Sequence, residues 1–202
     1  MTWYLWVAVA ALFAVGLCLL LGAKKAHWNT RSLANAAMCM AIGFVLGCIK
    51  LWEAPSGGAV TPASMLPLIM FCLAAGWRQG LAMGFAYGLL TLLQGAYIIH
   101  PVQMLLDYPL AYAAIALCCI VHPMRIPDTW KLPVGALFAS VGRLAMAVLS
   151  GVCFFADAAG EEGALLYSIA YNFSYMAWDF ALCLIVACIP GMNRLWKMLK
   201  TK

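Results

Sequence analysis

The chain has 202 residues, of which 66% are hydrophobic and only 9% are charged, and its formal net charge is +5. A water-soluble domain carries about 25% charged residues, so we expect this chain to lie in a lipid bilayer. Its few basic residues stand between apolar runs, which argues against a nucleic-acid partner. All nine cysteines fall within apolar stretches without metal-ligand spacing, so we expect them to be small apolar fillers in helices and expect no metal site.

Seven apolar segments are long enough, or nearly so, to cross a bilayer, which takes about 20 residues. We predict helices over 3–22, 31–51, 63–77, 80–99, 102–121, 132–155 and 166–189. The first segment lacks the basic leader of a signal peptide, so we expect it to be retained as a membrane helix. The predicted fold class is therefore all-α, a polytopic membrane helical bundle.

The loops between these segments alternate in charge. Basic side chains occupy the first loop, every second loop after it and the C-terminal tail, namely Lys24, Lys25, Arg31, Arg78, Arg125, Lys131, Arg194, Lys197, Lys200 and Lys202. The acidic side chains of the other loops are Glu53, Asp157, Glu161 and Glu162. Because lysine and arginine mark the cytoplasmic side, the N-terminus is predicted outside the cell and the C-terminus inside.

Away from their ends, the predicted membrane segments contain three charged residues, and a charge there costs about 2.5–3.5 kcal/mol. At about 1.5 Å per residue, Arg143 and Asp179 lie roughly 18 and 20 Å below the outer ends of their segments, so we predict an ion pair between them. Asp107 lies only about 8 Å below the outer end of its segment. The only basic residue near that level is Lys50, closer to the surface.

Aromatic and amide side chains share the predicted level of Asp107. Tyr108 is its neighbour, and Tyr167, Tyr171 and Asn172 lie on the last segment. A carboxylate ringed by aromatic faces can bind an organic cation through its charge and through cation–π attraction. The alternative is an interfacial aromatic belt with a solvated aspartate, and the residues alone leave both interpretations open.

Small residues recur every four positions in two of the segments, a spacing that lets helix backbones approach closely. The residues concerned are Ala37 and Ala41, Gly43 and Gly47, and Gly80, Gly84 and Gly88. Taken singly, each set favours packing inside the bundle.

Enzymatic motifs are missing from the sequence. It contains neither G-x-S-x-G nor the ATPase motif G-x-x-x-x-G-K-[ST]. We therefore predict a non-enzymatic protein without a cofactor, whose energy comes from a partner or a gradient.

Five stretches together resemble the thiamine-specific S component of energy-coupling factor (ECF) transporters: KLWEAPSGGAVTPASMLPL (50–68), GLAMGFAYGLL (80–90), YIIHPVQMLLDYPLAYA (97–113), GRLAMAVLSGVCFF (142–155) and LYSIAYNFSY (166–175). The resemblance runs from about residue 31 to the C-terminus. It implies a six-helix substrate-binding core over 31–202. Residues 1–30 would then form an additional N-terminal transmembrane helix and a cytoplasmic linker.

The resemblance also implies a function and partners. Members of that family bind thiamine near the outer face of the bacterial cell membrane, under the loop that joins their first two core helices. They deliver it through a transmembrane coupling subunit and two cytosolic ATPases, which use the ATP. The rival hypothesis is a self-sufficient secondary transporter or channel for a small organic cation.

The family's ligand residues fall on particular positions of this chain. Its acidic–tyrosine pair falls on Asp107 and Tyr108, its tyrosine and asparagine of the last helix fall on Tyr167 and Asn172, and a basic residue falls on Arg143.

Three further positions differ from the pattern of some members. Ala147 stands where they have a pocket histidine, and Phe155 stands where they have a tryptophan. The tryptophan of the covering loop falls near Gly58, and Trp52 could serve from nearby. The family's A-x-x-x-A contact for the coupling subunit matches Ala37 and Ala41.

Overall fold

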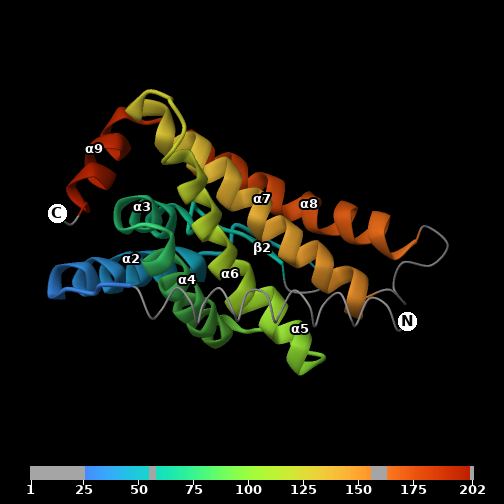
Figure 1. The fold of residues 1–202 in the computed structure, drawn as a ribbon. Coiled ribbons are helices and arrows are strands. Elements are labelled where there is room, and N and C mark those ends of the chain that lie inside the picture. Colours follow the sequence, from blue (N-terminus) through green and yellow to red (C-terminus); the bar gives the residue numbers. More distant parts are fainter. Residues whose placement is uncertain (1–25, 55–57, 156–162, 201–202) are drawn as a thin grey trace.

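The computed structural model describes residues 26–54, 58–155 and 163–200 (Figure 1). Its first half contains α2 (Thr30–Cys48), a hairpin of β1 (Trp52–Glu53) and β2 (Ala59–Val60), α3 (Leu66–Ala75), α4 (Trp77–Thr91) and the 3₁₀ turn η1 (Leu92–Gln94). One irregular helix follows, made of α5 (Pro101–Leu105), η2 (Leu106–Leu110), α6 (Ala111–Ala113) and η3 (Ala114–Val121). The last elements are α7 (Asp128–Phe154), α8 (Ala164–Ala187) and α9 (Pro190–Met198). The additional helix expected over 3–22 lies outside the described residues.

The described helices form a bundle around α3. α7 and α8 run side by side along their length (Figure 1), and α7 also packs along η3. α3 contacts α2, α4, α7 and η3, and seven of its ten residues are buried. A helix that is apolar on all sides is usually buried in a core. This explains why α3 lies at the centre of the bundle although it is short.

Four described helices are long and apolar enough to cross a membrane: Thr30–Cys48, Pro101–Val121, Asp128–Phe154 and Ala164–Ala187. α3 and α4 are shorter. The predicted class, a polytopic helical membrane bundle, is therefore confirmed.

Both bounds of the helix predicted over 80–99 are wrong. α4 begins at Trp77, and the chain leaves the helix at Gly95, whose φ of 92° lies in the left-handed region. Residues 95–100 are mostly apolar, so hydropathy extended the predicted helix through a segment that in fact turns back. A helix-stopping glycine at this position is a common device.

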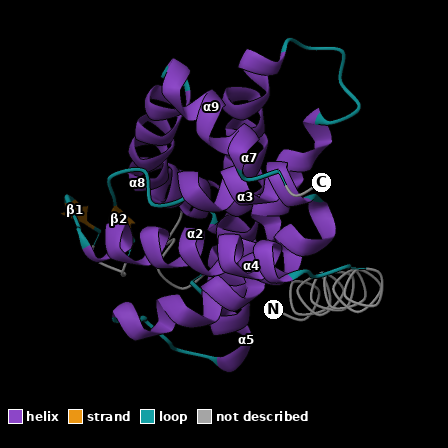
Figure 2. Cartoon of the chain, turned by 90° about the vertical axis from the view of Figure 1, so that its left-hand side faces the viewer, coloured by secondary structure: helices purple, strands orange, loops and turns teal. Residues whose placement is uncertain are grey.

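Two elements of the structure were not predicted. The β1–β2 hairpin lies at the edge of the bundle next to α8 (Figure 2). α9 is too short and too charged to resemble a membrane span. It buries Trp196, and it is fastened to α2 by a bond from Asn35 Nδ2 to the Leu199 carbonyl (3.2 Å) and to α7 by an ion pair between Lys197 and Asp128 (3.2 Å).

The irregular helix widens at its proline. Pro109 lies inside η2, a π-helical turn in which the Ala111 amide donates to the Leu106 carbonyl, five residues back. Proline lacks an amide hydrogen and its ring crowds the preceding turn, and a wider turn relieves both problems without ending the helix. Such turns are frequent at functional sites.

The glycine repeats pack inside the bundle, as predicted. A side chain at Gly84 or Gly88 would collide with the backbone of Tyr112 or Pro109 on the irregular helix. Gly43 and Gly47 are also buried on α2, where Gly43 faces the Ser64 carbonyl and Gly47 faces the Gln94 side chain. Ala37 and Ala41 differ, because both are exposed on the outer face of α2.

Candidate ligand-binding site

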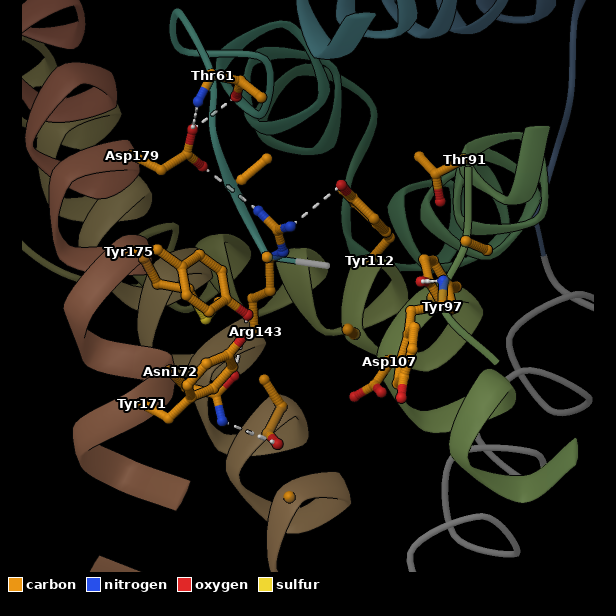
Figure 3. Close-up of a pocket in the computed structure, with 18 of the residues that line it drawn as sticks. Thr61, Thr91, Tyr97, Asp107, Tyr112, Arg143, Tyr171, Asn172, Tyr175 and Asp179 are labelled. Atoms are coloured by element: carbon orange, nitrogen blue, oxygen red, sulfur yellow. Dashed lines mark hydrogen bonds and ion pairs between the residues drawn. The ribbon is translucent and has the colours of Figure 1, made fainter. Parts of the chain in front are cut away.

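A cavity lies among η1, the irregular helix, α7, α8 and the end of the hairpin (Figure 3). Eight of the nine ligand positions inferred from the sequence line it: Gly58, Asp107, Tyr108, Arg143, Ala147, Phe155, Tyr167 and Asn172. Trp52 is the exception. Its position in β1 leaves the side chain 50% exposed, and it is not among the residues that line the cavity.

Asp107 is held by its own helix. Its Oδ2 accepts a hydrogen bond from Gln103 Nε2 (2.5 Å), one turn earlier. Gln103 also donates to the Tyr97 carbonyl (3.1 Å) and accepts from the Ile99 amide (3.2 Å). The segment before the helix is thus folded back against it, and the amide of Gln103 orients the carboxylate.

Tyr108 completes this side of the cavity. Its hydroxyl accepts a hydrogen bond from the Tyr97 backbone amide (2.9 Å). The Tyr97 ring in turn stacks on Phe155 at the end of α7, with 6.3 Å between ring centroids. An aromatic edge therefore lies beside the carboxylate.

Asp107 differs from the other described carboxylates in its partners. The others form ion pairs, which are Glu53–Lys50 (2.5 Å), Asp128–Lys131 (2.9 Å) and Asp179–Arg143 (3.4 Å). Within the described ranges, no lysine, arginine or histidine lies within 4.0 Å of the Asp107 carboxylate. The cavity therefore presents one negative charge that the protein does not neutralise by a direct pair.

Arg143 occupies the cavity wall and also forms the predicted ion pair. Its Nη1 lies 3.4 Å from Asp179 Oδ2, which confirms the pairing inferred from depth. Its Nη2 donates to the Tyr112 hydroxyl (3.2 Å), and the guanidinium lies over the Tyr112 ring at 4.6 Å. Its charge is thus balanced within the protein.

One face of α8 supplies polar groups and rings. Tyr175 donates from its hydroxyl to Asn172 Oδ1 (2.9 Å), and Asn172 Nδ2 donates to the Ser168 carbonyl (2.9 Å). The rings of Tyr167 and Tyr171 stack with 6.3 Å between centroids and an interplanar angle of 16°. Flat rings that share a cavity with a carboxylate lacking an ion-pair partner suit a planar organic cation.

Several cavity residues were missed from the sequence. Gln103 stands four residues before Asp107, and Tyr175 stands three after Asn172, so helical spacing alone could have found both. Tyr112 stands five residues after Asp107, a spacing that reaches the same face only because of the π-helical turn. Tyr97 and Thr61 lie on non-helical segments, for which periodicity gives no signal.

The described helices thus form a membrane bundle, and its polar, aromatic cavity contains a carboxylate that has no ion-pair partner among the described residues. The family model of the thiamine transporter protein (Thia_YuaJ) matches residues 33–198. The thiamine transporter ThiT of Bacillus subtilis (strain 168) is 35% identical over 150 residues, which are 69% of this chain and 78% of that protein. This chain belongs to the thiamine transporter protein (Thia_YuaJ) family, which confirms the resemblance found in its motifs.

A solved structure has a similar fold. ThiT from Listeria monocytogenes matches with a TM-score of 0.62 and 23% sequence identity, over 83% of this chain and 93% of that chain. At this identity, the match shows that the two proteins share the arrangement of their helices.

Proposed function

We propose that this chain is the substrate-capture subunit of an ECF-type vitamin importer, which binds thiamine from the outer face of a bacterial cell membrane. The observation that carries the proposal is the unpaired Asp107 carboxylate beside aromatic rings. Thiamine carries a permanent positive charge on its thiazolium ring, and its aminopyrimidine ring offers hydrogen-bond donors. Either ring could meet Asp107. The relatives named for thiamine transport support this choice of ligand.

The other cavity residues take complementary roles in this proposal. Tyr108, Tyr167 and Phe155 offer ring faces for stacking, and Ala147 leaves space beside Asn172. Arg143 adds no net charge because Asp179 balances it. Lys50 also lines the cavity and pairs with Glu53 (2.5 Å). Among the described lining residues, Asp107 therefore carries the charge without an ion-pair partner, which matches a ligand with one positive charge.

Calorimetry of the purified protein tests this function. We expect thiamine to bind without ATP and without partner proteins, and to change tryptophan or tyrosine fluorescence because rings line the cavity. Thiamine phosphates and unrelated vitamins serve as comparison ligands. If a well-folded sample does not bind thiamine or its phosphates at high micromolar concentration, the proposed function is wrong.

We further propose that transport needs a coupling subunit and two ATPases, because the chain contains no ATPase motif of its own. Protein reconstituted alone into vesicles should bind thiamine and not accumulate it. Accumulation driven by an ion gradient would support the rival hypothesis of a self-sufficient secondary transporter. The proposed orientation puts the N-terminus outside, the cavity toward the outer face and α9 at the cytoplasmic surface.

The exposed small residues on α2 give this proposal a docking surface. Ala37→Leu or Ala41→Leu should prevent close helix approach and abolish thiamine uptake by cells, while thiamine binding by the purified protein is retained. The matched control is Ala170→Leu, which adds the same bulk to an exposed position on α8 and should leave uptake intact. If binding and uptake fall together in the α2 variants, the docking role is wrong.

A further inference from the structure

The chain between the hairpin and α3 forms part of the cavity wall. Gly58, Ala59 and Thr61 line the cavity, and β2 packs against α8. We call residues 58–61 the wall segment. It is extended chain rather than helix, and its backbone bonds run to the other arm of the hairpin: the Leu51 amide donates to the Val60 carbonyl (2.9 Å) and the Ala54 amide to the Gly58 carbonyl (2.6 Å). These bonds tie it to the hairpin and not to the helices of the bundle.

One carboxylate fastens the wall segment. Asp179 Oδ1 accepts from both the backbone amide of Thr61 (3.0 Å) and its hydroxyl Oγ1 (2.6 Å), as the dashed lines in Figure 3 show. The Thr61 hydroxyl has only one hydrogen, which it donates to Asp179. In the 2.7 Å hydrogen bond between Thr61 Oγ1 and Ser64 Oγ, Ser64 must therefore be the donor.

This anchor is largely buried and charge-assisted. Asp179 is 2% exposed and Thr61 is 8% exposed. Hydrogen bonds to an ionised acceptor are about twice as strong as neutral ones, and burial limits the competition from water. The second oxygen of Asp179 holds Arg143, so the anchor itself is fixed to α7.

The wall segment also rests on α8 at its other end. A side chain at Gly58 would collide with the Tyr175 ring, so the backbone lies directly on that ring. Asn172, Tyr175 and Asp179 are three and four residues apart, which puts them on one face of α8. The same helix face thus supplies a candidate ligand residue, the support for Gly58 and the anchor for Thr61.

We infer that Asp179 is a positioning residue, which holds the wall segment against the cavity through Thr61 and thereby sets how slowly a bound ligand leaves. The identity of the ligand, thiamine, rests on the proposed function. A weakened anchor lets the wall segment leave its place more often, which raises the dissociation rate. Affinity differences between variants of one site lie mostly in that rate.

Two substitutions of Thr61 separate the anchor from simple packing. Thr61→Val keeps the shape and removes the hydroxyl, which breaks its bond to Asp179 and the bond it accepts from Ser64, while Thr61→Ser keeps the hydroxyl and both bonds. We expect Thr61→Val to speed thiamine dissociation by about tenfold, from the loss of one hydrogen bond to a charged acceptor. Thr61→Ser should recover most of the lost residence time. Stopped-flow fluorescence measures both rates.

A matched control removes a buried hydroxyl elsewhere. Ser140 Oγ donates to the Ala136 carbonyl within α7 (2.8 Å), and Ser140 does not line the cavity. Ser140→Ala should leave the dissociation rate within about twofold of the unsubstituted protein. Equal dissociation rates for Thr61→Val and Thr61→Ser would overturn the inference, as would an equal acceleration by Ser140→Ala.

A second measurement needs no ligand. Hydrogen exchange of the ligand-free protein, followed in peptides covering the wall segment, should be faster in Thr61→Val than in Thr61→Ser. Unchanged exchange would contradict the anchor directly. If thiamine does not bind the unsubstituted protein, the proposed function is wrong. The hydrogen-exchange comparison still tests whether Asp179 holds the wall segment. If Thr61→Val does not fold, Thr61→Ala replaces it in both comparisons.

Discussion

Asp107→Asn is expected to weaken thiamine binding about tenfold to more than a hundredfold, because a charge-assisted interaction is worth about 1.5–3 kcal/mol. The substitution keeps the shape of the side chain. It also keeps an oxygen that can accept the hydrogen bond from Gln103, so only the negative charge is lost. Calorimetry of the two purified proteins with thiamine measures the change.

The stability of the ligand-free protein distinguishes a binding charge from a structural one. Asp107 forms no ion pair within the described residues, so Asp107→Asn should leave the thermal midpoint unchanged or raise it. Tyr108→Phe should weaken binding less, since it removes a hydroxyl rather than a charge. If Asp107→Asn unfolds the empty protein and the folded fraction still binds normally, Asp107 is structural and the ligand binds elsewhere.

Breaking the ion pair between Arg143 and Asp179 should have the largest effect on stability. Arg143→Met leaves the buried Asp179 carboxylate without its partner, which costs about 3–5 kcal/mol. Asp179→Asn leaves Arg143, which is 17% exposed at the cavity wall, and should cost less. The double variant removes both charges and should cost less than the sum of the single changes. Denaturant unfolding in detergent, followed by fluorescence, measures the three free energies.

The same measurements separate the ion pair between Arg143 and Asp179 from the hydrogen bonds between Asp179 and Thr61. Strict additivity of the single and double variants would mean that the two side chains do not interact, despite their 3.4 Å separation. Asp179→Asn keeps an acceptor for Thr61, so its cost reports mainly on the lost partner of Arg143. The Thr61 variants, in contrast, leave this ion pair in place.

The parts of the site that follow helical periodicity and hydropathy could be predicted. The depth of Arg143 and Asp179 on neighbouring helices was enough to pair them, because a helix rises by a fixed amount per residue. Asp107 stood out because a charge in an apolar segment is costly. The motifs around both features were sufficient to recognise the family.

The parts that depend on irregular backbone could not be predicted. Thr61 and Tyr97 reach the cavity from extended or turning segments, whose course depends on tertiary contacts. Trp52 is close in sequence to the cavity-lining chain, yet its place in the hairpin leaves its side chain outside the lining. The helix expected to continue to residue 99 ends early because Gly95 adopts a left-handed conformation that hydropathy does not register.

Because of the π-helical turn at Leu106–Leu110, the number of residues in this turn determines which side chains of the irregular helix face the ligand. In a regular α-helix, Asp107 and Tyr112 would point about 140° apart, at about 100° per residue. With i→i+5 bonding they face one cavity. A related chain with one residue fewer in this turn would rotate everything beyond it and aim different side chains at the ligand, even if all its other residues were identical. A one-residue gap at this point in a sequence comparison is therefore a change of binding surface.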